Sequence, residues 1–432
     1  GTATGVFACR GWLLYSSIFV QRLSSLTPYH RNLKRETSPM EIAWQDWVGM
    51  MIRWLHLATG IAWIGTSFYF IWLDQSLRRS GQVPEGVQGE SWIVHGGGFY
   101  HVQKYMVAPE RLPAELHWFK YEAYFTWLSG FALLGVMYYW GAESFLMDPA
   151  RTPFSAPVAV LVSLAFLAGG WLAYDGLCRS AVGRHTAVLA LAVFLMIIGI
   201  GWGLTQLFSD RAAFVQIGAV IGTIMSANVF FVIIPNQKKV VADLKAGRVP
   251  APAFGLQAKQ RSLHNNYLTL PVLLLMVSAH YPILFAGAAS WGWLVIALIL
   301  LIGGVVRHFF NTLHVGIRGA ALLWQWPVAA VIGLILAVFL TSLGSGVSLA
   351  PVSEARALAI VDRHCVSCHA TKPTNSNFTT APAGVRLEGP EDLRRFAVQI
   401  LNQAVVSKAM PLGNASGMTD TERAELGTWL RR

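Results

Sequence analysis

The chain has 432 residues, which is long enough for two or three ordinary soluble domains. Its composition excludes that organisation, because 54% of the residues are apolar and only 13% are charged, about half the charged share of a typical globular protein. The chain is therefore neither disordered nor purely cytosolic, and its expected surroundings are a lipid bilayer. Nucleic acid is not an expected partner despite the net charge of +11, since the basic residues of membrane proteins gather in cytoplasmic loops.

The first 39 residues differ from the rest of the chain in their charge. They carry five basic residues, with no acidic residue before Glu36, and Met40 is the first methionine in the chain. We expect the native protein to begin at Met40 and residues 1–39 to be a non-native or disordered extension. A cleaved signal peptide is the alternative, with residues 11–20 as its apolar region, although no clear small-residue cleavage site comes after it.

Residues 40–343 contain eight apolar stretches that are long enough to cross a bilayer. A spanning helix needs about 20 mostly apolar residues, and tryptophans such as Trp72 and Trp118 lie near the ends of these stretches, as an interfacial aromatic belt would. We therefore predict an all-α fold, with an eight-helix transmembrane bundle as its larger part. The expected spans are 48–73, 118–140, 156–178, 186–208, 212–234, 264–286, 290–312 and 320–342.

The basic residues of the loops predict the orientation of these spans. If the chain before the first span lies outside, the inner loops hold thirteen Lys and Arg residues, whereas the outer loops hold only Arg151 and Arg211. This difference satisfies the positive-inside rule. We expect the N-terminus of the membrane domain to lie outside, and an even number of spans returns the C-terminal segment to the same side.

The C-terminal segment carries a C-x-x-C-H motif. After a short linker at 344–352, residues 353–432 form a charge-rich domain that contains Cys365, Cys368 and His369. Two thiols at this spacing can reach the two vinyl groups of one porphyrin while the adjacent imidazole ligates the iron, so we predict one covalent haem c. A zinc site is the alternative, but it would need a second pair of ligands, which this segment lacks.

The surroundings of the motif are typical of a small class I cytochrome c domain. An amphipathic helix is expected over 354–364, and a capping box at 419–422 opens a final helix. Met410 is the expected second iron ligand, because Pro411 stiffens the turn that presents its sulfur. Met418 is interpreted as a packing residue. Haem c is attached on the outer face of the bacterial inner membrane, in the periplasm, which agrees with the side that the charge count gives.

An intermediate redox centre would divide the path across about 30 Å of hydrocarbon. His56 in the first span and His280 in the sixth lie in the middle to outer half of their spans, so they are candidate ligands of a haem b. Ionisable residues inside membranes are functional hypotheses by default. The alternative is a histidine that is satisfied by hydrogen bonds between helices.

Residues 94–105, VHGGGFYHVQKY, join three glycines to histidine, tyrosine and lysine side chains. Glycines let the backbone approach a ligand closely, although a glycine-rich turn in a structured loop is the simpler interpretation. Together with the inner end of the sixth span, this segment could bind a flat, polar, anionic molecule between aromatic rings. The candidate catalytic residues are His101, Lys104, His117, His264 and Asn265.

Three segments and the fused C-x-x-C-H domain carry a resemblance to a known family. The segments are 54–73 (WLHLATGIAWIGTSFYFIWL), 94–105 and 117–131 (HWFKYEAYFTWLSGF). Together with the fused domain they resemble the membrane-bound, cytochrome c-linked bacterial urate oxidase family. The resemblance extends from Met40 to the C-terminus. It implies that urate is hydroxylated to 5-hydroxyisourate and that the electrons leave through haem c, towards a terminal oxidase or a soluble cytochrome, instead of reducing O2. From the family motif come the haem residues Cys365, Cys368, His369 and Met410, but no residue that contacts urate.

Two other classes of protein remain as alternatives. A quinol:cytochrome c electron-transfer protein of the cytochrome b type, without an organic substrate, predicts pairs of histidines that ligate stacked haems; the histidines here form no obvious set of four. A transporter with a redox sensor predicts acidic residues along a path through the membrane, and the interiors of the expected spans have almost none. Urate oxidation ranks first, the quinol protein second and the transporter third.

Overall fold

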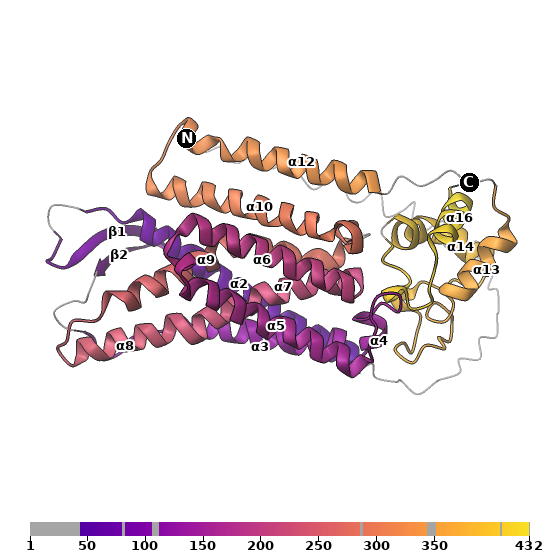
Figure 1. Ribbon diagram of the computed structural model, residues 1–432, viewed down its shortest axis with the longest axis horizontal. Helices are drawn as coiled ribbons and strands as arrows, with labels where there is room; N and C mark the ends of the chain where they lie inside the picture. The colour runs from indigo at the N-terminus through magenta and orange to yellow at the C-terminus, as the bar shows by residue number, and fades with distance from the viewer. Residues whose placement is uncertain are drawn as a thin grey trace, which may run out of the picture. The chain divides into compact units, whose positions relative to one another are not determined.

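The computed structural model describes residues 44–79, 83–105, 112–285, 288–343, 351–406 and 408–431. The predicted extension at 1–39 and most of the predicted linker lie outside the described residues. The described part of the chain is mostly helical (Figure 1). The helices before residue 344 are α2 (Trp44–Ser76), α3 (Tyr121–Leu134), α4 (Ala142–Phe145), α5 (Ala156–Arg179), α6 (Thr186–Leu207), α7 (Asp210–Ala227), α8 (Ile234–Lys245), α9 (Pro252–Val277), α10 (Ala288–Val315), α11 (Ala320–Leu323) and α12 (Gln325–Leu343).

Short π-helical and 3₁₀ segments connect several of these helices. The π-helix η1 continues α3, and the π-helix η3 joins α7 to α8, so that one continuous helical rod runs from Asp210 to Lys245. The bounds are η1 (Gly135–Tyr139), η2 (Ala181–Arg184), η3 (Asn228–Ile233), η4 (Ser278–His280) and η5 (Pro282–Leu284).

Five helices among the described residues are long and apolar enough to cross a membrane. They lie at five of the eight expected positions, which confirms a chain rich in membrane-length helices. The remaining three positions are also largely helical, in α2, α3 with η1, and α9 with η4 and η5, but these segments are shorter or more polar. The five helices are Ala156–Arg179, Thr186–Leu207, Asp210–Lys245, Ser290–Val315 and Ala320–Leu340.

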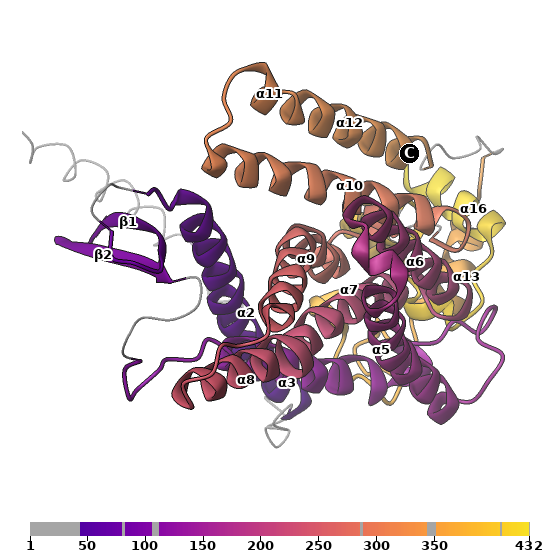
Figure 2. The same ribbon diagram turned by 60° about the vertical axis from the view of Figure 1, so that its left-hand side comes forward.

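Helix α7 forms the centre of the apolar bundle. Twelve of its eighteen residues are buried, among them Phe214, Ile217 and Ile221, so this helix is covered on most sides. It packs against α5, α6 and α9, while α10 packs against α6, α9 and α12. Figures 1 and 2 both show α10 between α12 and the pair α6 and α9. Helix α9 therefore contacts the central helix α7 on one side and α10 on the other.

Helices α9 and α10 approach closely at a proline and a glycine. A Cβ atom placed on Gly303 would lie 2.5 Å from Cδ of Pro271, so no larger residue fits at position 303 without displacing a helix. Pro271 stands inside α9 and has no N–H to donate to the carbonyl of Tyr267. This crossing sets the distance between the side chains that face each other one turn further along both helices.

The segment after α2 forms a β-hairpin, which is an exception to the predicted all-α fold. Strand β1 (Val87–His95) pairs antiparallel with β2 (Gly98–Tyr105), and His95 stands opposite Gly98. The two turn residues, Gly96 and Gly97, have φ angles of +60° and +82°, as a type I′ turn requires. The glycines thus allow the reversal of the chain.

Residues after 351 form a helical region with an apolar cluster of its own. Helix α13 (Glu354–His364) coincides with the predicted amphipathic helix, and α16 (Asp420–Leu430) begins at the predicted capping box of Thr419 and Glu422. Ile360, Leu393 and Leu426 are buried in the cluster. The other helices here are α14 (Pro390–Arg395), α15 (Ala397–Ile400), η6 (Pro382–Gly384), η7 (Leu401–Val406) and η8 (Leu412–Asn414).

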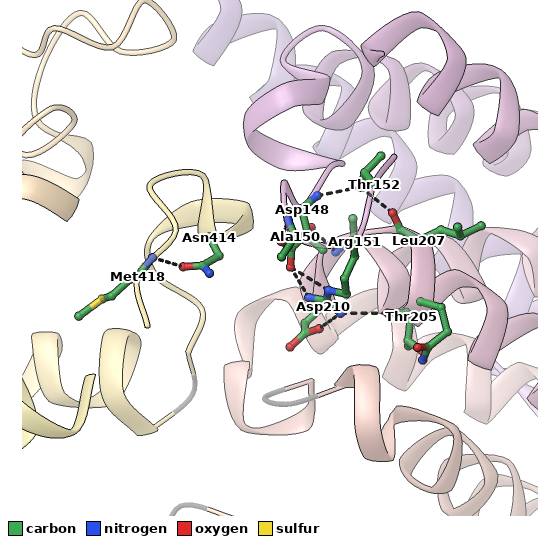
Figure 3. A network of polar contacts seen from close by, with 12 residues as sticks. Asp148, Ala150, Arg151, Thr152, Thr205, Leu207, Asp210, Asn414 and Met418 are labelled. Carbon is green, nitrogen blue, oxygen red and sulfur yellow. Dashed lines mark hydrogen bonds and ion pairs between the residues drawn. The ribbon is translucent and has the colours of Figure 1, made fainter. Parts of the chain in front are cut away.

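Arg151 ties the loop before α5 to the corner between α6 and α7 (Figure 3). Its Nε donates to Asp148 at 2.8 Å, and its Nη1 donates to Asp210 at 2.6 Å and to the carbonyl oxygen of Thr205 at 2.9 Å. All three charged side chains are largely buried. One guanidinium group therefore compensates two carboxylates that are close to each other.

Replacing Arg151 by Gln should destabilise the protein, because Asp148 and Asp210 would both lose their hydrogen bonds to this guanidinium group. We expect a loss of about 2 kcal/mol in the free energy of unfolding, the size of a lost set of charged hydrogen bonds. Thermal unfolding of the purified protein in one detergent measures this loss of stability. The matched control, Arg248→Gln, breaks an exposed pair with Asp243 and should cost well under 1 kcal/mol; equal losses in both variants would contradict the prediction.

Candidate functional site

A polar cluster, here called the Arg261 cluster, lies where α9 meets α5 and η3. Arg261 Nη2 donates to Asp175 Oδ1 at 2.7 Å, and the guanidinium carbon lies 4.9 Å from the centre of the Tyr174 ring. His264 and Asn265 follow Arg261 by three and four positions, which places all three on one face of α9. The members of the cluster are Tyr174, Asp175, Asn228, Arg261, His264 and Asn265.

Amide and hydroxyl groups connect the other members of the Arg261 cluster. Asn228, the first residue of the π-helix η3, donates to Asn265 Oδ1 at 3.0 Å and to the Tyr174 hydroxyl at 3.2 Å. The Tyr174 hydroxyl lies 2.7 Å from Nδ1 of His264. Since this hydroxyl accepts from Asn228, it can donate its own proton to Nδ1, and the neutral imidazole then carries its proton on Nε2. π-helical segments are frequent at functional sites.

A second polar cluster, the Arg307 cluster, lies on the other side of α9, against α10. Arg307 Nε and Asn311 Nδ2 both donate to Oδ1 of Asn266, each at 3.0 Å. The guanidinium carbon of Arg307 lies 4.1 Å from the centre of the Phe68 ring of α2. The three polar side chains are buried. Consecutive residues of α9, Asn265 and Asn266, therefore serve different clusters.

A tyrosine and a histidine stand next to the Arg307 cluster. The Tyr267 hydroxyl lies 2.8 Å from Nδ1 of His308, and these residues directly follow Asn266 and Arg307 in the chain. The His308 ring also lies near Trp324. Each polar cluster thus has a His–Tyr hydrogen bond, at His264 in one case and at His308 in the other.

The structure brings together only some of the residues that the sequence suggested for catalysis. His264 and Asn265 belong to the Arg261 cluster. His101 lies on the exposed hairpin, where its Nε2 is 2.6 Å from Glu90 and its ring stacks on Trp92 at 4.2 Å. Lys104 of the hairpin is ion-paired with Asp74 of α2, and His117 is exposed beside Phe119.

The residues that sequence analysis did not single out are the arginines, asparagines and tyrosine of the two clusters. A signal was present, because arginine and asparagine stand inside or beside long apolar stretches, where ionisable residues mark functional positions. The sequence could not show which of them meet, since their partners come from helices far apart in the chain. These residues are Tyr174, Asn228, Arg261, Arg307 and Asn311.

The two histidines suggested for a haem b lie in different surroundings. His56 of α2 is half-buried, its Nδ1 lies 3.0 Å from the carbonyl oxygen of Thr126, and its ring packs against Gly130 of α3. A carbonyl oxygen only accepts, so Nδ1 donates and Nε2 is left without a proton, as an iron ligand requires. His280 lies in the short segment after α9 and is exposed.

The C-x-x-C-H motif comes directly after α13. Cys365 and Cys368 are free thiols, and burial raises the pKa of the Cys365 thiol to about 12. Nδ1 of His369 lies 2.8 Å from the carbonyl oxygen of Val385, so Nδ1 donates and Nε2 is left to bind a metal. This arrangement fits a covalently attached haem whose iron is ligated by His369.

The loop that carries Met410 is held by Arg423 of α16. This buried guanidinium group donates to the carbonyl oxygens of Met410 and Ala404 and to Oδ1 of Asn414, the last at 3.0 Å. The backbone N–H of Met418 donates to the same Asn414 oxygen (Figure 3). The Met418 side chain is buried, whereas Met410 is half-buried at the edge of the apolar cluster. The buried position of Met418 agrees with a packing role, and Met410 as an iron ligand stays a prediction.

Glu422 joins the start of α16 to α13. Its carboxylate accepts hydrogen bonds from the backbone N–H and the hydroxyl of Thr419, both at 2.9 Å, and lies 3.3 Å from Nε2 of His364. The hydrogen bond from the Thr419 backbone is the largest cause that lowers the pKa of Glu422 to about 2. The ionised form therefore stabilises the folded domain above pH about 4.5, and this contribution is lost as the pH falls towards 2.

A Glu422→Gln variant should be less stable at pH 7 by about 1 kcal/mol, the size of a capping interaction. The difference from the original protein should shrink as the pH falls from about 4.5 towards 2, because the original then becomes protonated as well. Circular dichroism during thermal unfolding at several pH values measures this difference in stability. Glu391→Gln, at an exposed glutamate of α14, serves as the control; a difference that stayed constant with pH would contradict the assignment.

The comparisons with known proteins identify the region that contains both polar clusters. Residues 42–342 match the family model described as urate oxidase N-terminal. Neither curated proteins nor solved structures gave a match. The matched region covers α2 to α12 almost completely and is well over half of the chain. The chain therefore belongs to the urate oxidase N-terminal family.

Proposed function

We propose that this protein is a membrane-bound oxidoreductase that oxidises urate to 5-hydroxyisourate and passes the electrons to a c-type haem on its own chain. One observation carries the proposal: the urate oxidase N-terminal region, residues 42–342, is followed by a domain with a C-x-x-C-H motif. The first part relates the chain to urate, and the second provides a one-electron acceptor. Their fusion keeps donor and acceptor at an effective concentration on the order of millimolar.

The proposed setting is the bacterial inner membrane. Five described helices have the length and hydropathy to span it, and three further helical segments lie at the remaining positions of the eight spans that the sequence predicts. The distribution of Lys and Arg supports a periplasmic position for the domain at 353–432. With this orientation, the Arg261 and Arg307 clusters lie towards the cytoplasmic ends of their helices.

The stoichiometry of the reaction determines which chemical groups the protein must supply. Urate and one water molecule give 5-hydroxyisourate, two protons and two electrons, so a new C–O bond forms at C5 of urate and no O2 is consumed. The two protons need basic groups near the substrate. His264 and His308 are such groups, and a hydrogen bond to a tyrosine hydroxyl fixes the ring orientation of each. We assign the role of general base to His308, because its Nδ1 can donate to the Tyr267 hydroxyl and Nε2 then carries no proton and can accept one.

The haem would be held by thioether bonds to Cys365 and Cys368, with His369 and Met410 as iron ligands. When bound, it supplies a one-electron acceptor, and His/Met ligation raises its potential relative to bis-histidine ligation. Urate oxidation therefore requires two successive transfers or a second redox centre. His56, with Nδ1 fixed by the Thr126 carbonyl, is the described residue best arranged to ligate a haem b between the two sites. A terminal oxidase or a soluble cytochrome would take the electrons onward.

The visible spectrum of the purified, oxidised protein tests the proposed function. Urate added without oxygen should reduce the c-type haem, and 5-hydroxyisourate should appear at one molecule per two electrons accepted. Quinol should not replace urate. A protein reduced by quinol but not by urate would instead be an electron-transfer protein without an organic substrate, and a spectrum with no c-type bands would refute the haem assignment.

A His308→Gln variant should keep the haem content and urate binding but lose turnover by a factor of about 10² to 10⁴, the usual contribution of a general base. Anaerobic reduction of the haem by urate gives the rate, and reduction by dithionite shows that the haem itself is intact. His264→Gln is the matched control at the other His–Tyr pair. Loss of turnover in His264→Gln alone would move the assignment to the Arg261 side.

A further inference from the structure

Arg307 is a buried cation with no anionic partner in the part of the chain that the structure describes. Its side chain is 4% exposed, and no carboxylate among the described residues lies within ion-pair distance. Its Nε donates to Asn266, while its two terminal nitrogens donate to no group of the described residues. Burial of an uncompensated charge is strongly unfavourable, so the arrangement is incomplete as it stands.

Two buried polar atoms beside Arg307 also lack partners among the described residues. Nδ2 of Asn266 and Oδ1 of Asn311 make no hydrogen bond there, although their residues are 0% and 5% exposed. An unpaired buried donor or acceptor costs about as much as a lost hydrogen bond. Both atoms are unpaired for the same reason. Oδ1 of Asn266 accepts from Arg307 and Asn311, and these hydrogen bonds fix the orientation of both amide groups.

The Arg261 cluster of the same molecule differs from the Arg307 cluster in how its charge is compensated. Arg261 is equally buried, but Asp175 neutralises it at 2.7 Å, and the side-chain amides of Asn228 and Asn265 both donate hydrogen bonds. One arginine of α9 and α10 is therefore compensated by the protein and the other is not. The unpaired amide atom of α9 itself belongs to Asn266, on the side of α10.

We infer that Arg307, Asn266 and Asn311 bind the substrate as an anion-recognition site, with Phe68 as its aromatic wall. The inference rests on the proposed function and names residues of its substrate site. The unpaired groups comprise a cation, an N–H donor and a C=O acceptor. The urate monoanion has the complementary set in one plane: delocalised negative charge, ring carbonyl oxygens and ring N–H groups. A guanidinium group also recognises planar anions through several parallel hydrogen bonds.

The close crossing of α9 and α10 keeps this site in place. Gly303 precedes Arg307 by four residues and Asn311 follows it by four, so the three lie on one face of α10. Contact between Gly303 and Pro271 holds this face against α9. The three polar side chains of the site thus project from two helices whose separation is fixed, and helices hold binding groups more precisely than loops do.

An Asn311→Asp variant tests the inference, because it places a carboxylate beside Arg307 and supplies the missing anion from within the protein. Urate binding to the full-length protein in detergent, measured by equilibrium dialysis without oxygen, should weaken about 100-fold, as expected for loss of hydrogen bonds to a charged group. Without urate, the variant should unfold at a higher temperature than the original. Arg307→Gln should lose binding to a similar extent without gaining stability.

The matched control is Asn236→Asp, the same substitution at a buried asparagine of α8 that is bonded to Gln257. It should bind urate as the original does. Urate binding that is unchanged in Asn311→Asp and Arg307→Gln would overturn the inference while leaving the proposed function intact. Failure of the original protein to bind urate or be reduced by it would refute the proposed function instead. If inorganic phosphate raised the unfolding temperature of the original protein and urate did not, the site would bind a different anion.

Discussion

Two guanidinium groups buried among apolar helices determine how the polar interior is built. A buried charge requires compensation, and the chain provides it in two ways. Around Arg261, the protein supplies a carboxylate, a tyrosine ring and paired amides. Around Arg307, it supplies an aromatic ring and one amide oxygen and leaves the rest unpaired among the described residues. The remaining polar contacts between α5, η3, α9 and α10 depend on these two solutions.

Helix α9 can serve both groups because of the geometry of an α-helix. Consecutive residues are turned by about 100°, given 3.6 residues per turn, so Asn265 faces η3 while Asn266 faces α10. Asn265 thus belongs to a cluster in which its amide is paired, whereas Asn266 belongs to a cluster with unpaired atoms among the described residues. Both clusters depend on the same turn of one helix, so movement of α9 would affect both.

The sequence is sufficient to predict features that depend on local patterns. Helix α13 has the bounds that the sequence predicts, and the capping box of Thr419 and Glu422 is confirmed. The hairpin is not among the predicted elements, although Gly96 and Gly97 stand between segments of strand-like residues. Glycines that allow close approach of a ligand and glycines that allow a tight turn look alike in a sequence, and these two adopt the positive φ angles of the turn.

The candidate site can be predicted only in part, for a physical reason. His264 and Asn265 are recognisable because they stand together at the end of an expected span. Asn228 and Arg307 are not, since their importance arises from partners in other helices, at separations of about 40 residues in the chain. Likewise, the C-x-x-C-H motif is local, whereas the contact of Arg423 with the Met410 loop depends on how α16 folds back.

That contact has a consequence for the order in which the protein matures. The C-x-x-C-H motif ends at His369, but the guanidinium group that orders the Met410 loop stands at position 423, in the last helix. A chain that emerges from the membrane N-terminus first presents its two thiols before this loop can be ordered. If a haem is attached as proposed, the partly folded domain would offer it readier access to the thiols than the domain with α16 in place.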